Sequence, residues 1–301
     1  MKLTILGCYA ATPRGLTNPT SQLLEIRNHM FLVDCGEGTQ VELRKHKLKF
    51  SRIKHIFISH LHGDHFFGLP GLIATFNLLG REAELHVYGP KGIKEAITLL
   101  LKLGGSWTNY LLLFHELDSK ESELIFEDEK VSVRTIPLDH RVYTNGFLFQ
   151  EKEAPRVLDV TAVAKYGIDK SEFRNIKNGK DGTAKDGATI ANKKLTLDPP
   201  KPKSYAFCSD TAYKEDIIPI ITGVDLLYHE STFLEAQAGL CAKTKHTTAK
   251  EAATIAKKAK VAKLLLGHYS TRYKSISLFK EEAQTIFKNV ELAEDGKSFQ
   301  I

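Results

Sequence analysis

Three histidines and one aspartate lie within the six residues His60-Leu61-His62-Gly63-Asp64-His65. The apolar residues 56–58 precede them, and a segment with glycine and proline follows. Imidazole and carboxylate groups are ligands that suit zinc and similar divalent ions. Three of the 12 histidines of this 301-residue chain fall in this stretch, so a solvated polar turn explains it poorly. The pattern predicts half of a two-metal site at the end of a strand.

Length and composition are those of an ordinary globular protein. A chain of 301 residues can bury the core of one large α/β domain. The sequence has no apolar run of about 18 residues, and its start is typical of a first strand rather than a signal peptide. We therefore expect a cytoplasmic protein without a membrane partner. Its four cysteines lie far apart without a C-x-x-C pair, which predicts idle thiols rather than disulfides.

Short apolar runs alternate with turns along both halves of the chain, and helix signals separate many of them. Capping and glycine signals predict helices over residues 39–45, 68–79, 92–103, 248–260 and 278–288. Apolar runs predict strands over residues 21–25, 30–34, 53–59, 85–88, 114–117, 124–126, 131–137, 146–150, 204–209, 226–229 and 263–267. Residues 290–301 are expected to form a closing strand pair. Two strand-rich halves flanked by helices favour a layered αββα sandwich.

Further candidate ligands follow other predicted strands. His140 comes after residues 131–137, Asp210 after 204–209 and His268 after 263–267. A lone histidine is more often a surface or core residue, but the recurrence at strand ends favours ligands. Side chains at strand ends are held by rigid elements and can converge on one rim of a sheet. The sequence thus predicts that these residues complete the site.

A basic segment lies between His140 and Asp210. The whole chain has a net charge of +6, and residues 151–203 carry 10 Lys and 2 Arg against 8 acidic residues. Such a concentration of positive charge attracts phosphate backbones. A solvated, disordered surface loop would have a similar composition.

The H-x-H-x-D-H motif, followed in order by His140, Asp210 and His268, resembles the metallo-β-lactamase superfamily. The resemblance implies a four-layer αββα sandwich in the α/β (α+β) class, formed by residues 1–301 as one domain. It implies one metal held by His60, His62 and His140, a second held by Asp64, His65 and His268, and Asp210 bridging them. Asp34, which follows residues 30–33, matches an early aspartate that supports the ligands without binding metal.

Two divalent ions in such a site can activate water near neutral pH and bind the oxygens of a phosphodiester or carbonyl. Neither a G-x-S-x-G elbow nor a P-loop is present in the sequence, and no serine or cysteine nucleophile is required. The motif is therefore specific for hydrolysis at two metals but not for the bond that is cut.

Three later stretches resemble the ribonuclease Z family, the endonucleases that trim the 3′ trailer from precursor tRNA. They are His229-Glu230-Ser231-Thr232, Lys245-His246-Thr247-Thr248-Ala249 and the segment from Gly267 to Tyr273. The family shows H-E-[AS]-T, H-[ST]-T and H-x-S-x-R-Y in this order. The resemblance extends over essentially the full chain, although the stretch from Pro13 to Asn18 matches the family's start only loosely.

The resemblance implies that His246 is catalytic, since cutting a phosphodiester leaves a 3′-oxyanion that needs a proton or a positive charge. Glu230 could hold His246 cationic, or could be a capping or structural carboxylate. Asp64 is expected to accept the proton of water as well as bind metal. Arg272 could contact phosphate or form a structural salt bridge.

Ribonuclease Z enzymes carry an inserted flexible arm between their third and fourth metal motifs, where residues 151–203 lie. The resemblance therefore implies a tRNA-binding arm, with Arg174, Lys177 and Lys180 as candidate contacts, although Asp169-Lys170-Ser171-Glu172 replaces the family's usual Gly-Pro-rich turn. It also implies precursor tRNA as the substrate, a homodimer, and two zinc ions per subunit, with manganese as an alternative because these ligands accept both.

Three other functions share parts of this pattern. A small-molecule phosphodiesterase, for example for a cyclic nucleotide, would need the metals but neither the basic arm nor His246. A carboxyl-ester or lactone hydrolase of the same fold is a second alternative. The third is a metal-stabilised RNA-binding protein without catalysis, which the complete ligand set and His246 disfavour.

Overall fold

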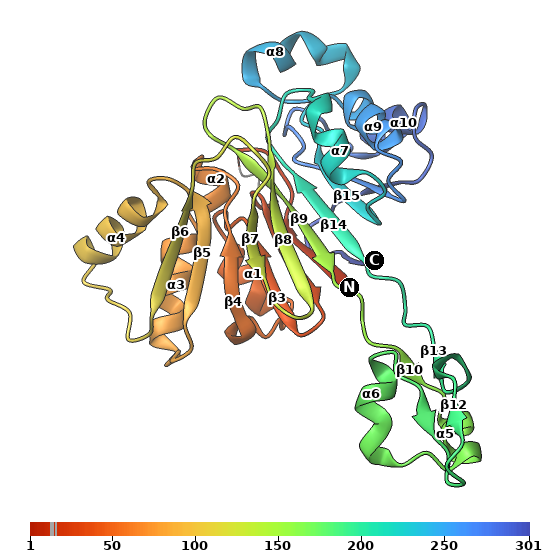
Figure 1. Ribbon diagram of the computed structural model, residues 1–301. Helices are drawn as coiled ribbons and strands as arrows, with labels where there is room; N and C mark the ends of the chain where they lie inside the picture. The colour runs from red at the N-terminus through yellow and green to blue at the C-terminus, as the bar shows by residue number, and fades with distance from the viewer. Residues whose placement is uncertain (13–14, 16) are drawn as a thin grey trace. The chain divides into compact units, whose positions relative to one another are not determined.

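Two β-sheets of seven strands each form the centre of the computed structural model, which describes residues 1–12, 15 and 17–301 (Figure 1). Pro13, Arg14 and Leu16 of the loosely matched segment therefore lie outside the described residues. The chain divides into two compact units. One contains Met1–Gln150 and Lys203–Ile301, and the other contains Glu151–Pro202.

The first sheet is built mostly from the N-terminal half, in the strand order β18-β1-β2-β3-β4-β5-β6. Strands β3 to β6 run parallel, whereas β1 pairs antiparallel with both β2 and β18. Its strands are β1 (Lys2–Gly7), β2 (Ser21–Ile26), β3 (His29–Val33), β4 (Ile53–Phe57), β5 (Leu85–Pro90), β6 (Leu112–Leu117) and β18 (Ser298–Gln300).

The second sheet has the order β17-β16-β15-β14-β9-β8-β7. Strands β14 to β17 run parallel, and β9 pairs antiparallel with β14. Its strands are β7 (Leu124–Glu127), β8 (Val131–Pro137), β9 (Asn145–Glu151), β14 (Ser204–Cys208), β15 (Leu226–Glu230), β16 (Leu264–Gly267) and β17 (Val290–Leu292).

Helices α1, α3 and α4 accompany the first sheet, and α9 and α10 pack on the second (Figure 1). The helices of this unit are α1 (Thr39–Lys45), α2 (Gly63–Phe66), α3 (Leu69–Leu78), α4 (Ile93–Leu103), α7 (Ile218–Ile221), α8 (Cys241–Thr244), α9 (Ala249–Lys258) and α10 (Ser277–Gln284). The predicted layered αββα arrangement is confirmed. None of the described helices combines the length and apolar character that crossing a membrane requires.

Aromatic side chains fill the space between the two sheets. Phe57 of β4 lies against Phe147 and Phe149 of β9, with ring centroids 5.5 and 5.3 Å apart, and all three side chains are fully buried. A second apolar cluster lies between the first sheet and its helices, with Leu72 and Ile97 at its centre. Burial on both sides makes the first sheet a rigid base for the loops at its rim.

The chain end differs from the expected closing strand pair. Strand β17 pairs with β16 in the second sheet, while β18 pairs with β1 in the first. The prediction of a pair between them was wrong because the chain crosses from one sheet to the other over residues 293–297. Helix α10 also ends at Gln284, four residues before its predicted end.

The smaller unit, Glu151–Pro202, is built from short elements around a small apolar core. Val163, Ile168, Ile176 and Leu195 form this core. The unit contains α5 (Val160–Tyr166), α6 (Phe173–Lys177) and the strand pairs β10 (Val157–Leu158) with β13 (Thr196–Leu197) and β11 (Gly182–Thr183) with β12 (Thr189–Ile190). None of these elements stood out in the sequence, since each is too short to show a period.

Candidate metal centre

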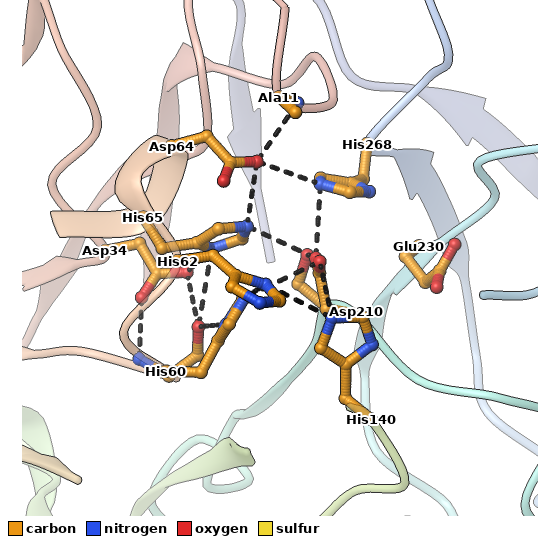
Figure 2. A network of polar contacts seen from close by, with 12 residues as sticks. Ala11, Asp34, His60, His62, Asp64, His65, His140, Asp210, Glu230 and His268 are labelled. Carbon is orange, nitrogen blue, oxygen red and sulfur yellow. Dashed lines mark hydrogen bonds and ion pairs between the residues drawn. The ribbon is translucent and has the colours of Figure 1, made fainter. Parts of the chain in front are cut away.

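The candidate ligands lie where strands of both sheets end. His60 and His62 follow β4, Asp64 and His65 lie on α2, and His140 follows β8. Asp210 comes after β14 and His268 directly after β16. Figure 2 shows these side chains pointing toward one another.

Three residues at these strand ends adopt left-handed backbone conformations. Asp34, Asp210 and His268 have φ values of 56°, 57° and 57°. Aspartate and histidine adopt this region several times more often than other non-glycine residues do, so these turns suit the residue types that occupy them. The three turns aim the side chains of Asp34, Asp210 and His268 into one shared centre.

The first ligand group surrounds Oδ2 of Asp210. The His60 and His140 Nε2 atoms lie 3.6 and 3.7 Å from this oxygen. Nδ1 of His62 lies 3.0 Å from His60 Nε2 and 3.2 Å from His140 Nε2. The four residues His60, His62, His140 and Asp210 each offer one ligand atom, and these four atoms lie within 4.8 Å of one another.

The second group surrounds the other oxygen of the same carboxylate. Oδ1 of Asp210 lies 3.2 Å from His65 Nε2 and 3.1 Å from His268 Nε2. Oδ2 of Asp64 lies 3.4 and 3.7 Å from the same two nitrogens and accepts a hydrogen bond from the Ala11 amide at 3.0 Å. Asp210 thus presents one oxygen to each group, as a bridging ligand must.

The donor set fits a pair of divalent cations. Nε2 of both His65 and His268 is buried and has no hydrogen-bond partner among the described residues. Leaving such atoms unpaired is costly unless something binds them. A nitrogen-rich set with bridging and terminal carboxylates matches the ligands that zinc and similar ions take. His60, His62, His140 and Asp210 would hold one ion, and Asp64, His65, His268 and Asp210 the other.

Asp34 anchors the first-sheet side of the centre. It is fully buried, and its Oδ2 accepts from His65 Nδ1 at 2.7 Å and from the Ser59 hydroxyl at 2.9 Å. The Ser59 hydroxyl donates its proton to Asp34, so the Ser59 oxygen can accept a hydrogen bond from His60 Nδ1, 3.0 Å away. Both rings are thereby fixed with a proton on Nδ1 and with Nε2 facing the centre, where a bound cation would take the place of a second proton.

Glu230 anchors the second-sheet side in the same manner. Its Oε1 lies 2.8 Å from His246 Nδ1, and its Oε2 accepts from the Thr232 hydroxyl at 2.7 Å. The Thr232 oxygen in turn lies 3.0 Å from His268 Nδ1. The structure therefore brings Glu230 and His246 together and joins them to a candidate metal ligand. The ring of His140, another candidate ligand, donates from Nδ1 to the Lys245 carbonyl at 2.9 Å.

Charge in the centre is set by burial and by the carboxylates. Burial opposes a charge on His246, but the paired Glu230 outweighs it and raises the pKa of His246 to about 9. Burial also opposes a charge on His65, yet Asp210, Asp34 and Asp64 raise its pKa well above the usual range. Burial, together with the neighbouring His65, lowers the pKa of His60. His246 also lies within reach of Asp210 and His268 in a third possible ligand group, but its pairing with Glu230 keeps it cationic at neutral pH.

Of the other predicted residues, Arg272 belongs to the larger unit and three cationic residues belong to the smaller one. The Arg272 guanidinium stacks over Phe233 at 5.0 Å and donates to the Ser270 hydroxyl at 3.1 Å, so it makes local contacts rather than a salt bridge among the interactions described. Arg174, Lys177 and Lys180 are exposed on the smaller unit.

Ser59 and Thr232 were not singled out in the sequence. Both lie inside predicted motifs, next to His60 and in the H-E-S-T segment, and both are almost fully buried. A hydroxyl residue beside a candidate ligand was the available signal, but serine and threonine are too common for it to carry weight alone.

Curated relatives match the chain over nearly its whole length. Ribonuclease Z of Bacteroides fragilis is 46% identical over 295 residues, which are 98% of this chain and 97% of the relative. Ribonuclease Z of Porphyromonas gingivalis is 47% identical over 284 residues, 94% and 93% of the two chains. The chain belongs to the ribonuclease Z family. The prediction made from the three later motifs is confirmed at this level, and with it the assignment to the hydrolases.

Solved structures agree with this family and its fold. The short form of human tRNase Z has a TM-score of 0.72 and 28% identity, covering 100% of this chain and 99% of its own. YhfI of Bacillus subtilis, a metallo-β-lactamase fold protein, has a TM-score of 0.69 and 19% identity, covering 99% and 98%. Residues 1–154 also match the family model described as Anti-Pycsar protein Apyc1. That half holds His60 to His65 and His140, whereas the ribonuclease Z relatives also cover Glu230, His246 and His268.

Proposed function

We propose that the protein is a metal-dependent endoribonuclease that removes the 3′ trailer from precursor tRNA and leaves a 3′-hydroxyl on the tRNA. The observation that carries the proposal is the buried His246–Glu230 pair beside two groups of metal ligands, in a chain of the ribonuclease Z family. Since its substrate would be precursor tRNA, we expect the enzyme to act in the cytoplasm.

The cofactor in this proposal is a pair of divalent ions, zinc or manganese. When bound, they would lower the pKa of water and bind the oxygens of the scissile phosphate. His60, His62 and His140 would hold one ion and Asp64, His65 and His268 the other, with Asp210 shared. Asp34 supports this set by fixing the His65 and His60 rings.

His246 is placed to complete the reaction as a general acid. Its ring lies near those of both His140 and His268, with centroids 5.1 and 5.3 Å away, and its side chain is about one-tenth exposed. Because Glu230 keeps it protonated, it can give a proton to the departing 3′-oxygen. Asp64 would accept the proton of the attacking water.

The smaller unit, Glu151–Pro202, would bind the tRNA through its own cationic side chains. Arg174 and Lys177 lie on α6 and Lys180 follows it, and all three side chains are exposed. Their positive charges suit a phosphate backbone, so recognition would rest on charge and on the shape of folded RNA.

We also propose a homodimer. Large apolar side chains are exposed together on α3, α4 and the segment after α4. Leu78 is 84% exposed, Leu103 76% and Trp107 61%. A surface of this kind commonly marks a protein interface. Leu103→Glu should shift the molecular mass in solution from dimer to monomer, whereas Lys102→Glu on the same helix should not.

The reaction is tested by comparing substrates. Metal-loaded protein should cleave a precursor tRNA with a 3′ trailer at a kcat/KM far above that for a cyclic nucleotide. His246→Ala should lower kcat by about 10²–10⁴-fold while the protein keeps its metal content, because this side chain is a general acid rather than a ligand. Faster hydrolysis of the cyclic nucleotide would identify a small-molecule phosphodiesterase instead.

A further inference from the structure

A pocket of about 420 Å³ opens beside the metal centre, with His140 in its wall. It is lined by the loop before β7, by residues 137–145 between β8 and β9, and by Lys214. The mechanism above uses none of these residues except His140. A pocket of this size lies in the range that holds a small ligand or one unit of a larger one.

The pocket is positively charged. Lys120, Arg141 and Lys214 line it, and the carboxylate of Asp139 is the one acid in its lining among the described residues. That carboxylate is already paired, since Lys245 Nζ lies 2.9 Å from Asp139 Oδ2. Lys120 and Arg141 are exposed and make no hydrogen bond or ion pair with any residue that the structure describes. Lys120 and Arg141 are therefore free to bind an anion, and Lys214, whose Nζ donates to the Pro137 carbonyl at 3.0 Å, keeps two further protons for one.

A buried acceptor in the same lining points independently to a ligand. Asn145 is 2% exposed, and its Nδ2 donates to the Tyr143 hydroxyl at 2.8 Å, which donates to the Ser119 carbonyl. Its Oδ1 is buried without a hydrogen-bond partner among the described residues. A buried acceptor left unpaired is destabilising, so a ligand hydroxyl or amine beside it would bind favourably. Ribose hydroxyls and base amines are such donors.

The pocket lies on the side of the centre where the 3′-oxygen would leave. Its wall residues Asp139 and His140 are bonded to Lys245, through an ion pair and through the Lys245 carbonyl. Lys245 directly precedes His246, the proposed donor to that oxygen. The nucleotide that carries the departing 3′-oxygen is the last one of the mature tRNA.

We propose that this pocket binds the last ribonucleotide on the tRNA side of the cleavage point, with Lys120, Arg141 and Lys214 holding its 5′-phosphate. The inference rests on the proposed function. These three side chains would position the substrate by binding a phosphate that is not cut.

The test combines a variant with a modified substrate. A precursor tRNA carries one uncharged methylphosphonate linkage, either 5′ of the last tRNA nucleotide or one linkage into the trailer. With the unmodified protein, the 5′ modification should raise KM roughly tenfold, because it removes a charge-assisted contact. Arg141→Ala should raise KM similarly with the natural substrate, and the 5′ modification should then add less than twofold.

Lys257→Ala, an exposed lysine of α9, is the matched control and should keep the full sensitivity to the modification. Arg141→Ala should also reduce the slope of log KM against log salt concentration by about 1. Lys120→Ala, on a separate loop, should repeat both results.

Two results would overturn the pocket assignment alone. One is that the effects of Arg141→Ala and of the 5′ modification on KM multiply, as those of two independent changes would. The other is that Arg141→Ala reduces the effect of the trailer modification instead of that of the 5′ modification, which would place this pocket on the trailer side. If the unmodified protein leaves natural precursor tRNA uncut while it hydrolyses a cyclic nucleotide, the proposed function fails, and this inference fails with it.

Discussion

At the scale of single residues, two hydroxyl groups support ligand rings of the centre in the same way. On one side Ser59 joins Asp34 to His60, and on the other Thr232 joins Glu230 to His268. Each carboxylate also pairs directly with a second histidine, Asp34 with His65 and Glu230 with His246. The hydroxyl proton goes to the carboxylate, so each ligand ring must keep its proton on Nδ1. Neither hydroxyl belongs to a candidate ligand group, yet each sets the orientation of a ligand ring.

Thr232→Val should weaken binding of one metal ion while leaving the fold intact. Valine keeps the shape of the buried side chain but cannot accept from His268 Nδ1, so the ring loses its fixed orientation. Loss of such a supporting contact lowers metal affinity by about 10- to 100-fold. Equilibrium dialysis against zinc should show one weakened site per chain.

Thr232→Ser, which keeps the hydroxyl, is the matched control and should bind both ions normally. Ser59→Ala should weaken the other ion, since Ser59 orients His60. Equal loss of both ions in Thr232→Val and Ser59→Ala would contradict separate support of the two positions.

The rate should depend on the charge of His246 at alkaline pH. Burial opposes that charge, but Glu230 raises the pKa of His246 from 6.5 to about 9. Because the pKa is raised, the ion pair contributes its full stability below about pH 6.5. That contribution and the protonated form of His246 are lost as the pH rises through about 9. We therefore expect kcat to fall above pH 9. In Glu230→Gln the fall should move to lower pH, and an unmoved profile would rule out this role of the pair.

At the scale of elements, the positions of strands and ligands could be predicted because burial leaves a strong pattern. Strand β4 is an apolar run ending in the histidine cluster, and helix α1 spans the predicted residues 39–45. The separate pairing of β17 and β18 could not be predicted, since three-residue strands carry no signal for a partner. The Asp34 and Glu230 contacts depend on residues 25 and 16 positions away in the chain, which no local pattern records.

Helix α9 begins directly after the His246 segment, so its cap connects stability to the site. The Thr248 hydroxyl accepts from the Glu251 amide at 3.1 Å, and Glu251 Oε2 accepts from the Thr248 amide at 2.8 Å. Thr248→Ala removes half of this capping box and should lower the free energy of unfolding by about 1 kcal/mol. Urea denaturation of metal-saturated protein measures it. Glu251→Gln keeps both contacts and should change little, and an equal loss in both variants would argue against the cap.

At the scale of the whole molecule, we propose that the larger unit cuts the bond and the smaller unit binds the RNA. All candidate ligands, His246 and the cationic pocket belong to the larger unit, whereas Arg174, Lys177 and Lys180 belong to the smaller one. The basic composition of residues 151–203 predicted an RNA-binding segment, and that role stays a prediction. Its small core around Ile176 could not be foreseen, because an apolar cluster of four side chains in 52 residues leaves no periodic pattern.

Removing most of the smaller unit should affect only the large substrate. Leu158 and Thr196 are paired across β10 and β13, so an Asn-Gly turn can join them in place of residues 159–195. We expect KM for precursor tRNA to rise roughly tenfold or more, since several phosphate contacts are lost. Hydrolysis of a small phosphodiester should persist. Replacing Arg174, Lys177 and Lys180 together by alanine keeps the unit and should give part of the same effect, whereas equal losses on both substrates would show a structural role.

We propose that the His246–Glu230 pair and the two ligand groups together cut precursor tRNA at the end of the mature sequence. The most direct measurement maps the product ends after metal-loaded protein has acted on a precursor tRNA with a 3′ trailer. We predict one cut, directly after the last nucleotide of the mature tRNA before any added CCA, with a 3′-hydroxyl on the tRNA and a 5′-phosphate on the trailer. A 3′-phosphate, scattered cuts, or an unchanged rate in His246→Ala would contradict the account.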